Sequence, residues 1–220
     1  MKTPTPAISI LYEDDSIVVV NKPAGLMVEP DRNGHPNLLN LVKKYVGNPA
    51  QKEDTYAQHI HRLDRPVSGI VLFAKQRSVL KNLSEQFAER KVKKYYQALT
   101  ANAPALKTGT LEHWHRKEKK KAVLFKTQEA YTEKAHLDYE ISPDGNLFLW
   151  RIQLHTGKYH QIRAQLASVE CPILGDTLYG SQELYQLNAI ALDASELIFR
   201  HPITSAELKI TSNNFLKLLS

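Results

Sequence analysis

The sequence predicts an α+β fold, in which strands mostly follow strands and helices are inserted at irregular intervals. The chain has 220 residues, enough to bury a core as one domain or as two small lobes. Its hydrophobic content of 42% and charged content of 24% are ordinary for a folded protein. Its strand-like runs are short and follow one another along the chain, which a regular βαβ array would not show.

The first predicted elements are a strand and a helix. Residues 16–20 (SIVVV) are mostly apolar and β-branched, which predicts a strand, and the turn-like NKPAG at 21–25 ends it. Apolar residues recur at helical spacing over 37–47, which predicts a helix that Gly47 ends.

The next pair is again a strand and a helix. The apolar run 68–74 is nearly continuous, which favours a central strand over an edge strand. Ser78 is the predicted N-cap of the helix that follows. The apolar residues of this helix recur at helical spacing, and they are Val79, Leu80, Leu83 and Phe87.

The second half of the chain is predicted to be mostly strand. The expected strands are 95–100, 134–142 and 147–154, with a turn at 143–146, and a late hairpin formed by 196–202 and 206–211. Residues 159–168 (YHQIRAQLAS) predict a helix. No internal repeat and no linker interrupts the pattern, so we expect one domain over 1–220.

Charge and cysteine content indicate the class of partner and the compartment. A net charge of +6 and a pI of about 9.2 favour a polyanion as partner. One cysteine, Cys171, excludes an intramolecular disulfide and a cysteine-rich zinc site, and is typical of a reducing compartment. The opening 1–15 lacks the apolar core of a signal peptide, and no apolar run approaches the roughly 18 residues of a membrane span. We therefore expect a cytoplasmic protein without membrane contact.

The stretch 58–75 places Asp64 among cations at the start of an apolar strand. His59, His61 and Asp64 are residue types that bind zinc or iron, but their spacing is not a metal signature and Arg62 would repel a divalent ion. A second interpretation is that Asp64 only caps its loop and pairs with a basic neighbour.

The stretch 154–167 joins a predicted strand to a helix that would carry Lys158, His160 and Arg163 in its first turns. Free N–H groups and the helix dipole attract anions, so cations there favour a phosphate site. The alternative is a solvated helix start with no ligand.

Basic residues flank Tyr95 and Tyr96 within 89–100. Side chains alternate along a strand, so one ring is expected in the core and the other is available to a ligand. An aromatic ring beside cations suits stacking on an RNA base, although a strand tyrosine is more often a core residue.

The residues 115–121 (HRKEKKK), here called the basic arm, are predicted to form a projecting hairpin. Its cations are Arg116, Lys117, Lys119, Lys120 and Lys121, against one acid. The arm is expected to contact RNA phosphates, and the alternative is a solvated tip without a role.

Several segments together resemble one family. HRLDRPVSGIVLFAK (61–75) resembles the catalytic motif of the RluA-type pseudouridine synthases, usually H-R-L-D-x-x-T-S-G before an apolar strand. KKYYQAL (93–99) is similar to the family's K-x-Y-x-A segment, and TGKYHQIRAQLA (156–167) to its T-G-R-x-H-Q-I-R block. CPILGDTLYG (171–180) matches the P-I-x-G-D-x-x-Y-G tail, and the resemblance covers residues 10 to about 210.

The resemblance implies a mixed, mostly antiparallel sheet flanked by helices, with a central catalytic cleft. It implies that Asp64 is the catalytic carboxylate, acting as nucleophile or as base, and that Arg163 keeps it ionised. Tyr96 would lie against the uracil, Ile162 would wall the pocket, and Arg62 would hold the RNA with its base extruded. Lys158 and His160 would contact RNA backbone, as would Arg116, Lys119, Lys120 and Lys121 of the arm.

The resemblance also bears on cofactors, partners and domains. The reaction is an isomerisation within one nucleotide, so no cofactor and no metal are expected. The partner is tRNA or rRNA, and we expect a monomer with no accessory RNA-binding domain. Two other functions stay open: an inactive RNA-binding module of the same fold, and a metal-dependent hydrolase built on His59, His61 and Asp64.

The sequence departs from the family pattern at four positions: Val67 replaces a usual threonine, Lys158 an arginine, and Gln165 and Asp193 a frequent histidine. None of them is the presumed catalytic acid, so they affect the expected substrate choice more than the expected activity.

Overall fold

The structure is a computed structural model that describes residues 8–47, 56–212 and 214. The chain divides into two compact units, one formed by residues 1–92 with 196–220 and the other by residues 93–195. The boundary between residues 195 and 196 falls inside the strand Leu192–Arg200. A single domain over 1–220 stays a prediction.

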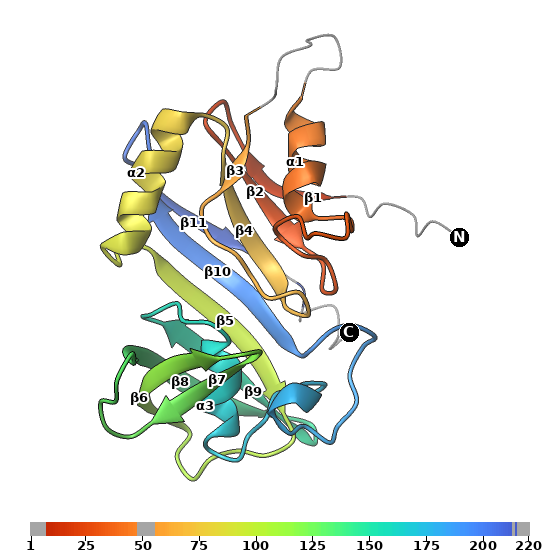
Figure 1. The fold of residues 1–220 in the computed structure, drawn as a ribbon, viewed down its shortest axis with the longest axis vertical. Coiled ribbons are helices and arrows are strands. Elements are labelled where there is room, and N and C mark those ends of the chain that lie inside the picture. Colours follow the sequence, from red (N-terminus) through yellow and green to blue (C-terminus); the bar gives the residue numbers. More distant parts are fainter. Residues whose placement is uncertain (1–7, 48–55, 213, 215–220) are drawn as a thin grey trace. The chain divides into compact units, whose positions relative to one another are not determined.

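The first unit is built on antiparallel strands (Figure 1). They are β1 (Ser9–Glu13), β2 (Ile17–Lys22), β3 (Gln58–His59), β4 (Ser68–Ala74), the second half of β10 (Leu192–Arg200) and β11 (Glu207–Thr211). Strand β2 pairs with β1 and β4, strand β4 also pairs with β3, and β10 pairs with β11. The predicted central strand and the late hairpin are therefore confirmed.

Helix α1 (Leu38–Val46) follows the predicted bounds closely. Asn37 caps it, since its Oδ1 accepts a hydrogen bond from the Asn40 N–H at 2.9 Å. The helix ends at Gly47, whose N–H still donates to the Lys43 carbonyl at 3.0 Å while its own backbone is extended.

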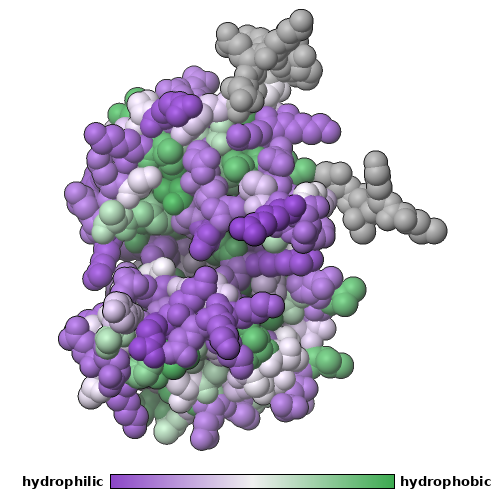
Figure 2. All heavy atoms as spheres, in the orientation of Figure 1, coloured by the Kyte–Doolittle hydropathy of each residue, from purple (hydrophilic) through white to green (hydrophobic). Residues whose placement is uncertain are grey.

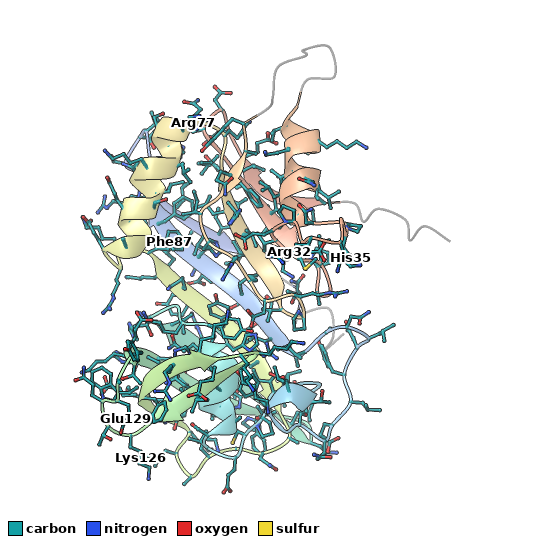
Figure 3. All side chains as sticks on the ribbon, viewed as in Figure 1. Arg32, His35, Arg77, Phe87, Lys126 and Glu129 are labelled. Atoms are coloured by element: carbon teal, nitrogen blue, oxygen red, sulfur yellow. The ribbon has the colours of Figure 1, made fainter. Side chains whose placement is uncertain are left out.

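Helix α2 spans Arg77–Ala88, and the labels of Arg77 and Phe87 in Figure 3 lie near its two ends. The prediction that Ser78 caps it was wrong. The capping position is Gln76, whose backbone is extended, so Ser78 already lies inside the helix. The predicted apolar face is confirmed, since Val79 and Leu83 are buried and Leu80 and Phe87 pack partly against the core.

The core of the first unit joins both helical and strand residues. Alternate side chains of β2 and β4 face it, namely Ile17, Val19, Ile70 and Leu72. Each fully buried aliphatic side chain of this kind contributes about 1.5–3 kcal/mol. This packing fixes β4, whose first residue lies four positions after Asp64.

The second unit has its own antiparallel sheet in the order β5-β9-β8-β6-β7. Its elements are β5 (Lys93–Thr100), β6 (Thr108–Glu118), β7 (Lys121–Phe125), β8 (Glu133–Asp144), β9 (Leu147–Leu154), α3 (Gln161–Ala167), the short η1 (Thr177–Tyr179) and the start of β10. The strands expected over 95–100, 134–142 and 147–154 are confirmed. Gly145, with φ of 58°, makes the tight turn between β8 and β9.

Helix α3 is shorter than the predicted 159–168. His160 has a left-handed backbone with φ of 51°, so the helix begins at Gln161 and has seven residues. Lys158 and His160 precede it, and the prediction that they occupy its first turn was wrong. The expected phosphate contact at the start of this helix stays a prediction.

The basic arm forms the hairpin that the sequence predicts. Strands β6 and β7 pair up to Glu118 and Lys121, which leaves Lys119 and Lys120 as the two-residue turn. Lys119 takes a left-handed φ of 50°, as such turns require.

Cys171 lies buried shortly after α3, and its thiol donates to the Val169 carbonyl at 3.2 Å. Burial, with a smaller contribution from Glu170, raises the pKa of the Cys171 thiol to about 11.

The surface carries mixed polarity. On the face shown in Figure 2, hydrophilic residues predominate and hydrophobic ones are scattered among them. Tyr131, Leu184 and Leu187 are each at least 90% exposed. Within the described residues, no helix is long and apolar enough to cross a membrane.

Candidate active site

Asp64 lies in the loop between β3 and β4, at the start of a tight turn. Its carbonyl accepts the Val67 N–H at 3.1 Å. Leu63 and Val67 are buried on either side, while Asp64 itself is half-buried. Buried apolar residues therefore flank Asp64, which is itself partly exposed.

Lys22, at the end of β2, is fully buried. Its ammonium donates to three backbone carbonyls: Leu26 at 2.8 Å, Pro23 at 3.0 Å and Arg65 at 3.3 Å. A buried ammonium is stable only when its donors are satisfied, and these carbonyls provide that. Lys22 thus joins the segment after β2 to the turn that carries Asp64.

Gly25 strengthens the same connection. Its N–H donates to the Arg65 carbonyl at 2.8 Å, and its own carbonyl accepts from Arg65 Nε at 3.0 Å. The sequence predicts residues 21–25 only as a turn. Nothing in the local pattern indicates that Lys22 and Gly25 form hydrogen bonds with Arg65, 43 and 40 residues later.

Arg62 and His59 share one acid, Glu29. Arg62 Nη1 lies 2.7 Å from Glu29 Oε2, and His59 Nε2 lies 3.1 Å from Oε1. Burial opposes the charge on Glu29, but Arg62 and then His59 outweigh it and lower the pKa of Glu29. Arg62 is still 64% exposed, so its predicted contact with RNA remains sterically open.

The histidines of the alternative metal site are bound elsewhere. His61 Nε2 accepts the Leu72 N–H at 3.3 Å, and its ring stacks on Phe87 with centroids 5.1 Å apart. His59 faces Glu29, and burial lowers the pKa of His59. Among the described residues, His59, His61 and Asp64 do not form a cluster of potential metal ligands, which argues against a hydrolase centred on them.

Tyr96 and Tyr95 of β5 have different surroundings, as strand alternation predicts. Tyr96 lies opposite Ile152 of β9 and is 9% exposed. Tyr95 is partly exposed, and the Arg151 guanidinium carbon lies 5.4 Å from its ring centroid.

Arg163 forms a buried two-point ion pair with Asp176. Its Nε lies 2.7 Å from Oδ2 and its Nη2 lies 2.9 Å from Oδ1, with both side chains at least 90% buried. The guanidinium carbon also lies 5.1 Å from the Tyr179 ring centroid. A guanidinium has five N–H donors, so this pairing is compatible with a second carboxylate partner. Ile162, beside it on α3, is 4% exposed.

Gly175 allows Asp176 to reach this position. Its φ is 79°, and an added Cβ would lie 2.7 Å from Tyr185 Cβ and 2.9 Å from the Ala189 carbonyl oxygen. Asp176 belongs to the tail motif 171–180, but the sequence pattern alone does not identify its partner.

Two buried glutamines fix α3 to the sheet. Gln161 Oε1 accepts from the Thr156 hydroxyl at 2.8 Å and from the Lys158 N–H at 3.0 Å. Gln165 Nε2 donates to the Leu111 carbonyl at 2.9 Å, and its Oε1 accepts from Gln161 Nε2 at 3.0 Å. This network orients Arg163, which lies between the two glutamines in sequence.

Lys158 and His160 each contact side chains of the second unit. Lys158 Nζ pairs with Glu133 Oε1, and this hydrogen bond lowers the pKa of Glu133. His160 stacks on Tyr159 with centroids 3.8 Å apart, and its Nδ1 lies 3.1 Å from the Tyr179 hydroxyl.

The cations at the base of the basic arm contact other protein side chains, whereas those at its tip are exposed. Arg116 Nε pairs with Glu118 at 2.9 Å, and the guanidinium lies 4.8 Å from the Phe125 ring centroid. Lys117 Nζ lies 4.4 Å from the Tyr159 ring centroid. The tip lysines are exposed, and they are Lys119, Lys120 and Lys121.

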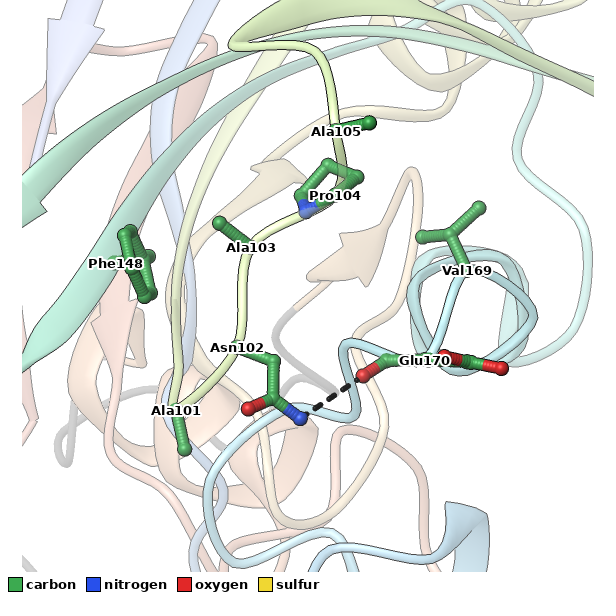
Figure 4. A pocket seen from close by; sticks show the side chains of 8 residues that line it. All are labelled: Ala101, Asn102, Ala103, Pro104, Ala105, Phe148, Val169 and Glu170. Atoms are coloured by element: carbon green, nitrogen blue, oxygen red, sulfur yellow. Dashed lines mark hydrogen bonds between the residues drawn. The ribbon is translucent and has the colours of Figure 1, made fainter.

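A separate hollow of about 630 Å³ lies in the second unit (Figure 4). Asn102 Nδ2 donates to the Glu170 carbonyl at 3.2 Å at its edge. Its lining consists of residues 101–105 with Phe148, Val169 and Glu170, so it contains none of the predicted site residues.

The predicted site residues are divided between the two units. Asp64 and Arg62 belong to the first, and Tyr96, Ile162 and Arg163 to the second. The pairing of Arg163 with Asp64 stays a prediction.

Comparison with known proteins agrees with the motifs. The family model described as RNA pseudouridylate synthase matches residues 16–168. A protein of Chlorobaculum parvum named an uncharacterized RNA pseudouridine synthase is 34% identical, over 93% of this chain and 70% of that protein. The dual-specificity RNA pseudouridine synthase RluA of Escherichia coli is 32% identical, over 90% of this chain and 89% of its own length.

A solved structure shares the fold. Human RNA pseudouridylate synthase domain containing 4 aligns with a TM-score of 0.73 and 25% identity, over 92% of this chain and 87% of that chain.

Proposed function

Because the chain belongs to the RNA pseudouridylate synthase family, we propose that Asp64 is its catalytic carboxylate and that its substrate is a uridine in structured tRNA or rRNA. The chain is an RNA pseudouridine synthase and hence an isomerase. The observation that supports Asp64 most strongly is its place in the H-R-L-D segment, inside the matched region, at a turn held by Lys22 and Gly25.

The reaction defines what the carboxylate does. The bond from ribose C1′ to uracil N1 breaks, and a bond from C1′ to uracil C5 forms. The C5 proton leaves and N1 gains one, so no atoms or electrons enter from outside. A carboxylate beside the sugar acts as a nucleophile at C1′ or as a base on the sugar, and either role requires its ionised form.

Residues of the second unit are proposed to complete the site. Arg163 would hold Asp64 ionised, and the rigid attachment of α3 through Gln161 and Gln165 supports a fixed guanidinium. Tyr96 would lie against the uracil, and Ile162 would exclude water beside it.

RNA binding must also provide the free energy that moves the target uridine out of its stack. A uridine must leave its stack to reach a protein carboxylate, which costs a few kcal/mol in a duplex and less in a loop. Contacts of Arg62 and of the exposed arm lysines with RNA backbone would offset that cost. Loops and bulges of tRNA or rRNA are therefore the proposed targets. The cytoplasmic location and the monomeric state stay predictions, which fractionation and light scattering test.

The deciding experiment uses Asp64→Asn, which keeps the size of the side chain but can neither attack nor accept a proton at neutral pH. Release of tritium from RNA labelled at uridine C5 is the readout, with cellular tRNA and rRNA as separate substrates. We expect release by the wild type and none by Asp64→Asn, while RNA affinity stays near normal. Asp15→Asn, at an exposed aspartate, is the matched control.

Turnover by Asp64→Asn close to that of the wild type would refute Asp64 as the catalytic group. No release by the wild type from any RNA would favour the inactive RNA-binding module instead.

A further inference from the structure

Three neighbouring strands of the second unit bring two histidines and two acids into adjacent rows. In the register of β6 and β8, Glu112 lies opposite His136 and Thr110 lies opposite Asp138. His155 directly follows β9, and its N–H donates to the His136 carbonyl at 3.2 Å. His136 and Asp138 are two residues apart on one strand, so they share a face of the sheet.

The side chains converge on that face. Asp138 Oδ2 lies 2.7 Å from His155 Nε2, and Asp138 Oδ1 lies 3.5 Å from His136 Nε2. The two imidazole centroids are 4.3 Å apart. One ligand atom from each of the three residues falls within 4.8 Å of the others.

We propose that His136, Asp138 and His155 bind one divalent transition-metal ion, and that zinc is the preferred ion. Two imidazoles and a carboxylate are ligands that suit zinc, whereas calcium and magnesium prefer oxygen alone. Zinc bonds of about 2.0–2.2 Å in a tetrahedral site place ligand atoms roughly 3.3 Å apart, so small side-chain rotations suffice. The three side chains are 31–46% exposed, so water can occupy the fourth position.

A second layer of polar side chains lies around these ligands. Glu112 Oε1 lies 3.8 Å from His136 Nδ1, the ring nitrogen that faces away from Asp138. The Thr110 hydroxyl donates to Asp138 Oδ1 at 2.6 Å, which leaves Oδ2 as the metal-facing oxygen. A carboxylate behind a ligand histidine and a hydrogen bond to a ligand carboxylate are usual around protein-bound zinc.

The backbone of the site is rigid as well. The His136 N–H donates to the Thr156 hydroxyl oxygen at 2.8 Å, and its carbonyl accepts from Gln161 Nε2 at 3.2 Å. A site on paired strands with fixed backbone loses little entropy when the ion binds. The proposed ion takes no part in the isomerisation, and the inference does not rest on the function proposed above.

The experiment is a calorimetric titration of the full chain with zinc chloride, together with cobalt(II) absorption, which reports the ligand geometry. We expect one zinc ion per chain for the wild type and a cobalt spectrum of tetrahedral intensity. Asp138→Asn and His155→Gln should each weaken zinc binding by at least about 10-fold, and Glu112→Gln by about 10-fold through its second-layer contact. Zinc should raise the melting temperature of the wild type more than that of the ligand variants.

His35→Gln is the matched control, because His35 is also an exposed histidine paired with an aspartate, 2.6 Å from Asp31, on the segment before α1 (Figure 3). It should leave zinc affinity unchanged. Circular dichroism and melting without metal show whether each variant is folded. Absence of saturable binding by the wild type, an unchanged affinity in folded Asp138→Asn and His155→Gln, or an equal loss in His35→Gln would each overturn the proposal.

Discussion

Asp176 is neutralised by Arg163 through two hydrogen bonds of 2.7 and 2.9 Å, and both side chains are buried. Removing one partner of such a pair leaves an uncompensated charge in the interior. A substitution of Arg163 therefore changes stability through Asp176, besides any effect on the proposed chemistry at Asp64.

These two effects can be separated. Arg163→Met should lower the free energy of unfolding by about 3–5 kcal/mol, because Asp176 loses its buried partner. The double variant Arg163→Met/Asp176→Asn removes both charges and should recover most of that stability, while its activity stays as low as that of Arg163→Met. Denaturant unfolding and single-turnover rates measure the two quantities. Recovered activity in the double variant would mean that Arg163 only holds Asp176.

Arg163→Lys should have an activity between those of the wild type and Arg163→Met, because it keeps the charge and loses the forked geometry. If the guanidinium keeps Asp64 ionised, the acid limb of the pH–rate profile should move to higher pH in Arg163→Met. Rates measured from pH 5 to 9 decide this, and equal losses without a pH shift would contradict it.

Lys22→Met tests the attachment of the turn that carries Asp64. The change leaves buried carbonyls without their donor, at about 1–3 kcal/mol for each one left unsatisfied. We expect a clear loss of stability together with a lower turnover rate. Lys209→Met is the control, because Lys209 pairs with Glu196 at the surface and should contribute less than about 1 kcal/mol. Equal stability of the two variants would exclude the proposed role of Lys22.

The arm is tested by replacing Lys119, Lys120 and Lys121 with glutamine. Binding to all RNAs should weaken alike, and the dependence of affinity on salt should become flatter, because fewer phosphates are neutralised. The single-turnover rate at saturating RNA should change little.

A control for the arm removes three exposed lysines elsewhere, namely Lys44, Lys81 and Lys107. This control variant loses the same net charge as the arm variant. A difference between the two therefore reports the position of the lysines rather than the total charge. A salt slope equal to that of the wild type in the arm variant would leave the hairpin tip as a solvated turn.

The lowered pKa of Asp14 predicts that the stability of the fold depends on pH. Burial opposes its charge, but hydrogen bonds from the Ser16 and Ile17 N–H groups and from His201 outweigh it and lower the pKa of Asp14. A carboxyl group with a lowered pKa stabilises the fold above its unfolded value of about 3.9, and this stability is lost as pH falls through the folded value.

Asp14→Asn should therefore be less stable than the wild type near neutral pH, and the difference should shrink as pH falls below about 4. Asp15→Asn, at an exposed neighbour, should show no such trend. Unfolding free energies at several pH values provide the comparison, and a difference that grows in acid would contradict the assignment.

The elements that the sequence predicted well are those whose signal is local. The run 68–74 coincides with β4 because a strand buried on both faces is nearly continuously apolar. The start of α3 was missed because His160 takes a left-handed conformation that no helical propensity encodes. The Ser78 cap was missed by two residues, within the usual uncertainty of helix ends.

The site was only partly predictable, because its contacts join distant positions. Lys22 forms a hydrogen bond with Arg65, which is 43 residues away in the sequence, and Arg163 forms one with Asp176, which is 13 residues away. The cluster of His136, Asp138 and His155 depends on the register of β8 and β9, which hydrophobic patterns do not fix in detail.

The buried thiol of Cys171 has a practical consequence for spectroscopy. It is the single cysteine of the sequence, it is 1% exposed, and with a pKa of about 11 only about one thiol in ten thousand is ionised at pH 7. A maleimide dye should therefore react with a cysteine introduced at the arm tip, such as Lys120→Cys, and leave Cys171 unmodified. The natural chain then serves as a background without a reactive thiol, and fluorescence from a single known position can report when the arm contacts RNA.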